Sequence, residues 1–479
     1  MKNIIIKSLF LVVVLLYSSC MNEGLESLNE DTKNATVADP GGFFANATVS
    51  LAANINGLPY RATGPGITRL WVQHFTSVTY LEGATYIPEY SWAELYRDVL
   101  NDLNESSKIL AGTVASNPGE EKVIKNQQAM IEILKVYAYS NLVESYGNIP
   151  YSEALDFNNA LPKYDDAKTV YLDLIDRLTS AINNIDSGVA GFGSSDLIYD
   201  GQAIKWIKFG NSLKLRMGMR IMDVLPQIGS EIILEATTLL IESNDDNATF
   251  RYLSEYPNTS PWYNFTVRQG LKYFVGTNTF IDKLNDFDDP RRSVFFTPTS
   301  DGTFKGAQYG VTQDYYSFSK QGQYFDEPEL ATIFIDYAQV QFLLAEAAER
   351  QVAGITDAES YYNEAIRASL EYYNISSEDA DEYLSQPNIN YSTAQGTWQE
   401  KIGTQKWIAL FNQGFEAWTE YRRLDYPKLT APAEAESDIV PLRFLYPISE
   451  QTQNGSSYEA AAAAIGGDNY STKLFWDVE

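Results

Sequence analysis

The hydrophobic positions of this chain recur mostly at helical spacing. Ala129, Ile133 and Val136 lie four and three residues apart, so they share one face of a helix predicted over Asn126–Tyr146, which ends before Gly147. The same period predicts further helices over Asp165–Ile185, Ala203–Met222, Ser230–Ile241, Ile333–Val352, Asp357–Tyr373 and Trp398–Arg423. The pattern therefore predicts a mainly α fold, with Asp165–Met222 and Ile333–Tyr373 as packed antiparallel pairs.

Two of these helical segments are similar to each other. The segment from Tyr171 to Ile185 and the segment from Tyr361 to Ile375 both begin with a tyrosine and end in Asn-Ile. Repeated helical pairs are typical of tetratricopeptide-like solenoids, in which each repeat buries the apolar face of its neighbour. The sequence therefore predicts tetratricopeptide-like helical-pair repeats.

Two long segments, residues 250–278 and 295–330, have no helical period. Both are rich in Gly, Pro, Ser, Thr and aromatic residues. Irregular segments of this length inside a compact body usually carry function or form a small subdomain. We therefore expect a loop-rich, irregular ligand-binding face beside the helices.

The N-terminus has the pattern of an export signal. Lys2 and Lys7 precede the apolar run from Leu9 to Leu16, which is shorter than the roughly 20 residues that a membrane-spanning helix needs. Small residues then lead to Cys20, the single cysteine of the chain. This arrangement resembles a bacterial lipobox, although Tyr17 stands where leucine is usual. A plain secretory signal with an incidental cysteine is the alternative.

These features divide the chain into three parts. Residues 1–19 are predicted to be a lipoprotein signal peptide, and Cys20 is the predicted site of lipidation, for example with palmitate. Residues 20–40 are polar and acidic, so we expect an acylated tether. Residues 41–479 contain no stretch that resembles an interdomain linker, and they are predicted to form a single helical domain.

The composition narrows the possible partners. The chain of 479 residues carries 35 basic and 63 acidic residues, which gives a formal net charge of −28. Nucleic acids and anionic lipid surfaces attract clustered Lys and Arg, so this balance disfavours both. The 33 tyrosines, 23 phenylalanines and 8 tryptophans supply rings for a core and for binding platforms.

Residues for catalysis are scarce in this sequence. His74 is the single histidine and lies on a predicted helix from Thr68 to Ser77, where a satisfied core or surface role is expected. The sequence offers no Ser/His/Asp set, nucleophilic cysteine, phosphate-binding loop or His/Cys metal set. We therefore predict no enzyme, no cofactor and no metal. A glycosidase that uses two carboxylates is the enzyme alternative, because acidic residues are abundant.

The loops contain the mixtures of residues that bind sugars. Pyranose C–H faces pack on aromatic rings, and polar side chains satisfy the hydroxyls. Trp262 follows Pro261, so a fixed backbone is expected to present its ring outward. The alternative is that each ring anchors its loop to the core. The predicted ligand-binding residues are Tyr80, Tyr86, Trp262, Tyr263, Asn264, Tyr315 and Tyr316.

Four motifs in sequence order resemble those of the SusD/RagB family of Bacteroidetes outer-membrane lipoproteins, and they are nearest the SusD-like branch. They are the helix from Asn211 to Arg220, the Asp289-Pro290-Arg291 turn, the segment from Gln405 to Arg423, and the tail from Pro441 to Asp477. Phe475 is a mild departure from the family pattern, in which tryptophan is common at this position.

Most of these motifs are expected to be structural. Arg216 and Arg220, four apart on one helix, are expected to form salt bridges or to cap carbonyls. Asp289 is expected to end a helix at a turn rather than to bind calcium or to catalyse.

The resemblance implies the function of the chain. It implies a SusD-like helical domain that is lipid-anchored at the outer membrane and faces the exterior. There it would bind an oligo- or polysaccharide and deliver it to a TonB-dependent SusC-like transporter. Peptide binding of the RagB type is the alternative that the same family allows.

Overall fold

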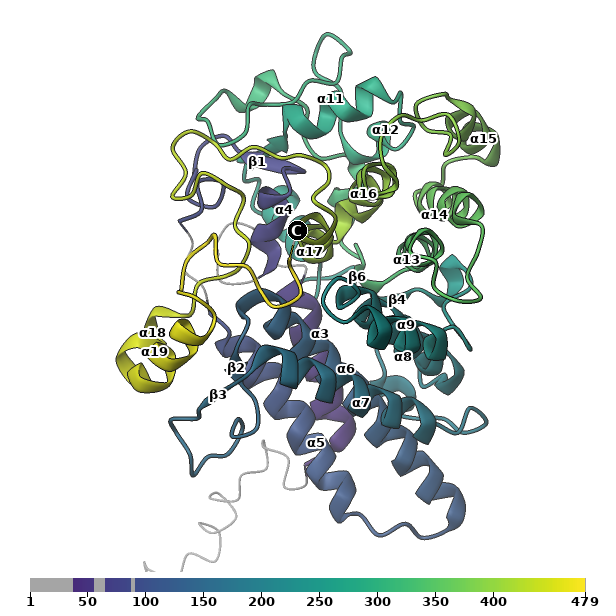
Figure 1. The fold of residues 1–479 in the computed structure, drawn as a ribbon, viewed down its shortest axis with the longest axis vertical. Helices are drawn as coiled ribbons and strands as arrows, with labels where there is room; N and C mark the ends of the chain where they lie inside the picture. The colour runs from purple at the N-terminus through teal and green to yellow at the C-terminus, as the bar shows by residue number, and fades with distance from the viewer. Residues whose placement is uncertain (1–37, 56–64, 88–90, 479) are drawn as a thin grey trace, which may run out of the picture. The chain divides into compact units, whose positions relative to one another are not determined.

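The computed structural model describes residues 38–55, 65–87 and 91–478 (Figure 1). Signal peptide, Cys20 and nearly all of the predicted tether lie outside these residues. From Pro40 onward the chain forms one compact unit. Helices dominate this unit, so the predicted mainly α fold is confirmed. None of the helices in the described ranges is long and apolar enough to cross a membrane.

Strands are short in the described part of the chain. They form three two-stranded antiparallel sheets. The pairs are β1 (Phe75–Ser77) with β5 (Phe274–Gly276), β2 (Ile149–Pro150) with β3 (Tyr164–Asp165), and β4 (Ala248–Phe250) with β6 (Thr332–Ile335).

Most predicted helices are present with shifted ends. They are α6 (Pro118–Tyr146), α7 (Ala167–Asn184), α8 (Ala203–Arg220), α9 (Pro226–Ala236) and α14 (Ala358–Tyr372). Helix α6 begins well before residue 126 because the Asn117 side chain accepts hydrogen bonds from two backbone amides and Pro118 occupies the first turn. It ends at Gly147, whose φ of 87° favours glycine, as the sequence predicted.

Three predicted helices are wrong in part. Residues Thr332–Ile335 form strand β6, and α13 (Tyr337–Glu349) begins only after Asp336, whose carboxylate accepts from the Gln339 amide at 2.7 Å. A fully buried apolar run of this kind fits a strand as well as a helix. The helix predicted from Thr68 is limited to α4 (Thr68–Trp71), since β1 follows.

The segment from Trp398 to Arg423 is two helices rather than one. Helix α16 (Trp398–Ala409) is followed by a short 3₁₀ turn, and α17 (Gly414–Leu424) begins after Gln413, whose φ of −130° is not helical. The remaining helices are α3 (Pro40–Ile55), α5 (Asn101–Gly112), α10 (Pro261–Tyr263), α11 (Asn278–Asp286), α12 (Arg292–Phe295), α15 (Ser377–Ser385), α18 (Ile448–Gln453) and α19 (Gly455–Ala464).

Consecutive helices pack as pairs. Helix α6 packs on α7, α8 on α9, α13 on α14 and α16 on α17 (Figure 1). Helix α7 also packs on α8, so both predicted helical pairs, Asp165–Met222 and Ile333–Tyr373, are in contact. This pairwise packing is the arrangement that the repeat pattern predicted.

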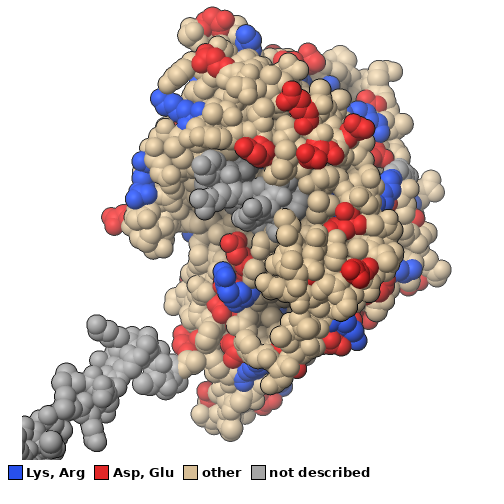
Figure 2. Space-filling view, turned by 90° about the vertical axis from the view of Figure 1, so that its left-hand side faces the viewer, with Lys and Arg blue, Asp and Glu red and all other residues tan. Residues whose placement is uncertain are grey.

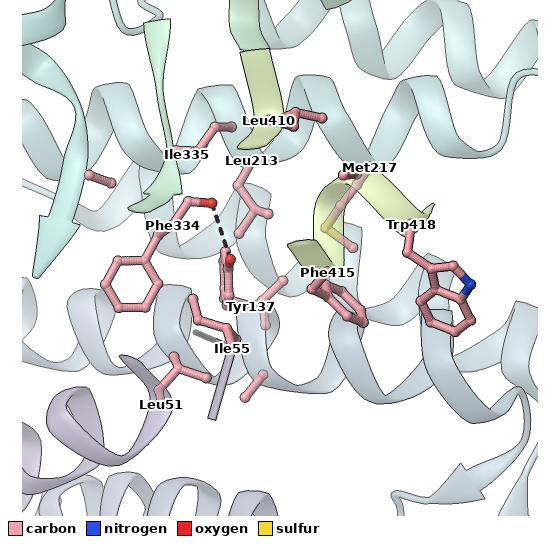
Figure 3. Packing of buried hydrophobic residues seen from close by; sticks show 14 of the residues in the cluster. Leu51, Ile55, Tyr137, Leu213, Met217, Phe334, Ile335, Leu410, Phe415 and Trp418 are labelled. Carbon is pink, nitrogen blue, oxygen red and sulfur yellow. Dashed lines mark hydrogen bonds between the residues drawn. The ribbon is translucent and has the colours of Figure 1, made fainter. Parts of the chain in front are cut away.

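The helix pairs share one core with the first helix and the last ones. Figure 3 shows Leu51 of α3, Tyr137 of α6 and Leu213 of α8 near Phe334 and Ile335 of β6, with Phe415 and Trp418 of α17 farther along the same core. The Tyr137 hydroxyl donates to the Phe334 carbonyl at 3.1 Å, which satisfies a polar group inside the core. Segments that are far apart in the sequence therefore share this core.

A set of buried charges lies inside this core. We call it the buried ion network, and it comprises Glu144, Arg216, Arg220, Glu346, Lys406, Glu416, Glu420 and Arg423. Arg220 of α8 contacts Glu416 of α17 at 3.0 Å and Glu144 of α6 at 3.4 Å. Lys406 of α16 contacts Glu420 at 2.7 Å. The expected structural role of Arg216 and Arg220 in salt bridges is thus confirmed.

Candidate ligand-binding surface

The single histidine takes no part in a reactive site. His74 is fully buried, and its Nε2–H donates to the Trp407 carbonyl at 3.0 Å. Its ring packs against Phe280 and Phe411. Burial lowers the pKa of His74 to about 3, so the imidazole is neutral. The prediction of a core residue is confirmed, although only Nε2 is hydrogen-bonded and the buried Nδ1 has no partner among the described residues.

The Asp-Pro-Arg motif is also structural. Arg291 is fully buried and contacts the Asp289 carboxylate at 2.6 Å, and it donates to Ser369 and Gln405 at 3.0 and 3.2 Å. These bonds join the turn after α11 to α14 and α16. Across the described ranges, no three His, Cys, Asp or Glu side chains are grouped as metal ligands.

Trp262 does not present its ring to solvent, which corrects the expectation from the sequence. Its indole is fully buried and packs against Phe75 and Phe325, with ring centroids 5.3 and 5.5 Å away. Ser260 caps the short helix α10 by accepting from the Trp262 amide at 3.2 Å. This turn directs Trp262 into the core, and the guanidinium of Arg69 lies 5.3 Å from its ring.

Tyr86 is also buried, contrary to the expected contact with ligand. Its ring packs edge-on against Trp71 at 6.1 Å, and no part of it reaches solvent. Burial raises the pKa of the Tyr86 hydroxyl, so it stays neutral. Tyr86 therefore anchors its loop to the core, which was the alternative interpretation of these rings.

Two further candidates lie partly inside the protein. Tyr263 is half-buried. Asn264 is half-buried too, and its side chain accepts from the Thr259 hydroxyl at 2.9 Å and donates to the Thr259 carbonyl at 3.0 Å. The Asn264 amide therefore braces its own loop.

The remaining candidates form an exposed cluster with one residue that the sequence analysis missed. We call Tyr80, Tyr273, Tyr315 and Tyr316 the aromatic face. Tyr80 is 46% exposed and Tyr316 is 66% exposed. Tyr80 packs edge-on against Tyr273 at 4.8 Å, and Tyr315 packs edge-on against Tyr316 at 5.5 Å.

Main-chain pairing holds these rings together. The Val78 amide donates to the Tyr273 carbonyl at 2.9 Å, next to the β1–β5 pair, and the Gln313 amide donates to the Val78 carbonyl at 3.1 Å. Beneath the rings, Tyr315 packs on a small cluster of Val78, Val275, Ala307 and Phe318. Three segments that are distant in sequence thus meet on one surface.

Asp314 fixes the direction of the third segment. Its carboxylate accepts from the Tyr316 amide at 3.4 Å and from the Ser317 hydroxyl at 2.8 Å, which caps the 3₁₀ turn Tyr315–Ser317. Burial raises the pKa of the Tyr315 hydroxyl, so this group stays neutral and can donate a hydrogen bond.

A groove adjoins the aromatic face. Its volume is about 670 Å³, which lies within the usual range for ligand sites. Its lining includes Leu81, Val311 and Thr312, from the segments that carry Tyr80 and Tyr315, and residues 430–434. Gln73 braces its floor by donating to the Thr430 carbonyl at 2.7 Å. The face and the groove together provide exposed rings beside polar groups.

Tyr273 lies in the irregular segment 250–278, but it was not among the predicted binding residues. Its signal was the short run Leu271-Lys272-Tyr273, which precedes strand β5. A strand brings the residues at its edges beside a neighbouring segment, so a tyrosine at the start of a short strand was a reasonable candidate.

The fold and this surface define a mainly helical protein with exposed tyrosines beside a groove. The chain belongs to the SusD-like family, because the family model described as "Starch-binding associating with outer membrane" matches residues 32–447.

Solved structures agree with this assignment. A chitin-binding protein is 26% identical, with a TM-score of 0.77 over 92% of this chain and 100% of its own. A SusD homologue from Bacteroides thetaiotaomicron is 25% identical, with the same TM-score and coverage. A chitin-binding SusD homologue from Flavobacterium johnsoniae is 24% identical over 91% of this chain and 99% of its own, with a TM-score of 0.76, and supports the fold. No significant match was found among curated proteins.

Proposed function

We propose that this protein captures a glycan on the aromatic face and the adjoining groove. The observation that carries the proposal is the pair of exposed tyrosines, Tyr80 and Tyr316, on segments that the hydrogen bond from the Gln313 amide to the Val78 carbonyl joins. Rings of this kind pack on the C–H faces of pyranoses, and the groove supplies hydrogen-bonding partners for hydroxyls. Family membership and the similarity to a chitin-binding protein support the same ligand class.

We infer that delivery to a transporter follows capture. The family description places its members at the outer membrane. In this proposal the protein presents its glycan to a TonB-dependent SusC-like transporter and performs no chemistry. The test is co-purification from detergent-solubilised membranes: the tagged protein is expected to retain one large outer-membrane transporter. Recovery of the protein without any such transporter would contradict the proposal.

Anchoring is proposed through Cys20, which lies outside the described residues. Residues 1–19 would be removed, residues 20–40 would act as the acylated tether, and residues 41–479 would form the exposed body. Cys20→Ser is expected to abolish labelling with palmitate and to release the protein from the outer membrane. Continued labelling of the serine variant would show that the lipid is attached elsewhere.

Binding is tested with the protein that lacks residues 1–19. A glycan array identifies a ligand, and calorimetry then compares Tyr316→Ala with the parent. Loss of one stacking ring costs about 1–3 kcal/mol, so affinity should fall about tenfold with an unchanged melting temperature. Phe157→Ala is the control, because Phe157 is 81% exposed on the segment between β2 and β3. Equal effects of both substitutions would place the ligand elsewhere.

The two alternatives receive less support from the molecule. A glycosidase needs two carboxylates that reach the polymer. Near the aromatic face, Asp314 caps the turn that holds Tyr316, and Asp326 is half-buried and accepts from the Thr266 hydroxyl. Peptide capture of the RagB type is not favoured, because the match is to the SusD-like model. Incubation with the bound glycan should therefore release no shorter product, as judged by chromatography.

A further inference from the structure

The aromatic face is surrounded by lysines that pair with aromatic rings. The Lys272 ammonium lies 5.3 Å from the centroid of Tyr316, the Lys320 ammonium 5.3 Å from that of Tyr315, and the Lys305 ammonium 5.4 Å from that of Phe318. In the described part of the chain, no carboxylate oxygen lies within the 4.0 Å ion-pair distance of these three ammonium groups.

These lysines belong to a protein that is acidic as a whole. The formal net charge is −28, and acidic side chains are spread over the face in Figure 2. Some other lysines pair with carboxylates, as Lys122 does with Asp186 and Lys208 with Asp246. Within the described ranges, further lysines lie near an aromatic ring without an ion pair: Lys205, Lys283, Lys401 and Lys428. Lys272, Lys305 and Lys320 differ from these in position, because they lie next to the rings of the aromatic face or the ring of Phe318 beneath it.

The three ammonium groups keep hydrogen-bonding capacity for a ligand. Each ammonium has three donors. Lys272 uses one on the Tyr316 hydroxyl at 3.2 Å, and Lys320 uses two on the carbonyls of Phe318 and Tyr316 at 2.6 and 3.3 Å. Lys272 and Lys305 are exposed, so their remaining donors face solvent.

Hydrogen bonds and chain neighbours place these lysines beside the aromatic face. Ser319 and Lys305 exchange two hydrogen bonds, at 2.9 and 3.0 Å, which sets Lys305 next to the segment that carries Lys320. Lys272 directly precedes Tyr273 of the face. Cations and stacking rings therefore share one surface.

Two carboxylates lie in the same region, and both are occupied. Asp314 caps the turn that holds Tyr316, and Asp326 is half-buried and accepts from the Thr266 hydroxyl at 3.4 Å. Neither forms an ion pair with the three lysines. The cations are thus left for a charged group that comes from outside.

We propose that the ligand of the aromatic face is an acidic glycan, whose carboxylate or sulfate groups contact Lys272 and Lys305 while its pyranose rings stack on Tyr80 and Tyr316. This inference rests on the proposed function and names the class of glycan. The net negative charge of the protein disfavours anions in general, so selection for such a ligand must be local, through stacking and adjacent charge together.

The test uses acidic glycans beside their neutral forms. Oligogalacturonate and oligomannuronate are each titrated in parallel with their methyl esters, and a chitin oligosaccharide serves as a neutral reference. At low salt, at least one acidic glycan is expected to bind about tenfold more tightly than its ester, and the difference should shrink as salt is raised.

The charge is then removed from the protein. The double variant Lys272→Gln and Lys305→Gln should weaken acidic binding about fivefold and leave binding of the ester within about twofold. Lys125→Gln with Lys168→Gln removes the same charge from α6 and α7 and should change neither. Lys320 is left intact because it braces two carbonyls.

The outcomes separate this inference from the proposed function. Equal binding of acid and ester, with no effect of the lysine substitutions, would overturn the acidic ligand but leave glycan capture intact. Binding of an oligoglutamate peptide as tightly as of the uronates would also overturn it, because a peptide offers no pyranose faces. If none of the glycans binds, including the chitin oligosaccharide, both proposals are wrong.

Discussion

The buried ion network and the aromatic face both join residues from distant parts of the chain, but different forces hold them in place. In the network, each charge has lost water and depends on opposite charges nearby. On the aromatic face, the rings of Tyr80 and Tyr316 keep their contact with solvent. Substitutions in the buried ion network are therefore expected to destabilise the fold. Substitutions on the aromatic face are expected to change ligand binding and to leave the fold intact.

Glu420 shows how strong the constraint in the network is. Burial alone would raise the pKa of its carboxyl, but Arg423, Lys406 and Arg220 outweigh burial and hold the pKa well below the usual value. Removal of one partner leaves a buried charge without compensation. The family motifs that contain Arg220 and Glu420 thus belong to the scaffold. The proposed binding residues Tyr80 and Tyr316 lie outside the four motifs.

The sharpest way to test this contrast is to break the network. Arg220→Met leaves Glu144, Glu416 and Glu420 facing an apolar side chain, and we expect a loss of about 5 kcal/mol in the free energy of unfolding. Chemical denaturation of the variant and the parent measures this change in the free energy of unfolding.

The matched control for this substitution is an exposed arginine. Arg97→Met removes the partner of Asp98 at the surface, where solvent screens the pair, and we expect no measurable change in stability. If both substitutions had equal effects, the network would not be essential to the scaffold.

Trp262 provides the second test, because sequence and structure assign it to opposite regions. Trp262→Ala empties a fully buried site next to Phe75, so the free energy of unfolding should fall by about 3–4 kcal/mol. Affinity for glycan, measured on the folded fraction, should stay unchanged. A variant that keeps its stability but binds glycan more weakly would show that Trp262 contacts the ligand.

The wrong prediction for Trp262 shows that the sequence predicts helices better than the direction of side chains in loops. Helical spacing located α6, α7, α8 and α14, since a buried face must repeat every three to four residues. No such period exists in the loops, where the direction of a ring depends on one cap, as with Ser260 and Trp262. Tyr273 and the lysines around the face became visible only once strand pairing had brought their segments together.

A pH experiment tests the scaffold at a buried carboxyl outside the network. Burial raises the pKa of Asp336 to about 6, against the hydrogen bonds from Gln339 and Gln413 that favour its charged form. The folded state therefore binds a proton more tightly than the unfolded state. This contribution to stability is complete below about pH 4 and is lost as the pH rises to about 6.

Asp336→Asn removes this titration. Relative to the parent, the variant should gain on the order of 2 kcal/mol between pH 4 and pH 7, because only the parent must bury a charge at the higher pH. Thermal unfolding of both proteins across this range measures the difference. A constant difference between the two would mean that Asp336 titrates normally.

The smallest expected effect distinguishes how the aromatic face works. Tyr80 packs edge-on against Tyr273 and is 46% exposed, so its ring is open to a stacked sugar. If the ring carries the contact, Tyr80→Phe should keep affinity within about twofold, whereas Tyr80→Ala should lose about tenfold. Neither should change the melting temperature, since no core packing is lost. Calorimetry with the array-selected glycan measures both. An equal loss in the Phe and Ala variants would show that Tyr80 binds through its hydroxyl, and the face would then resemble the ion network in depending on polar contacts.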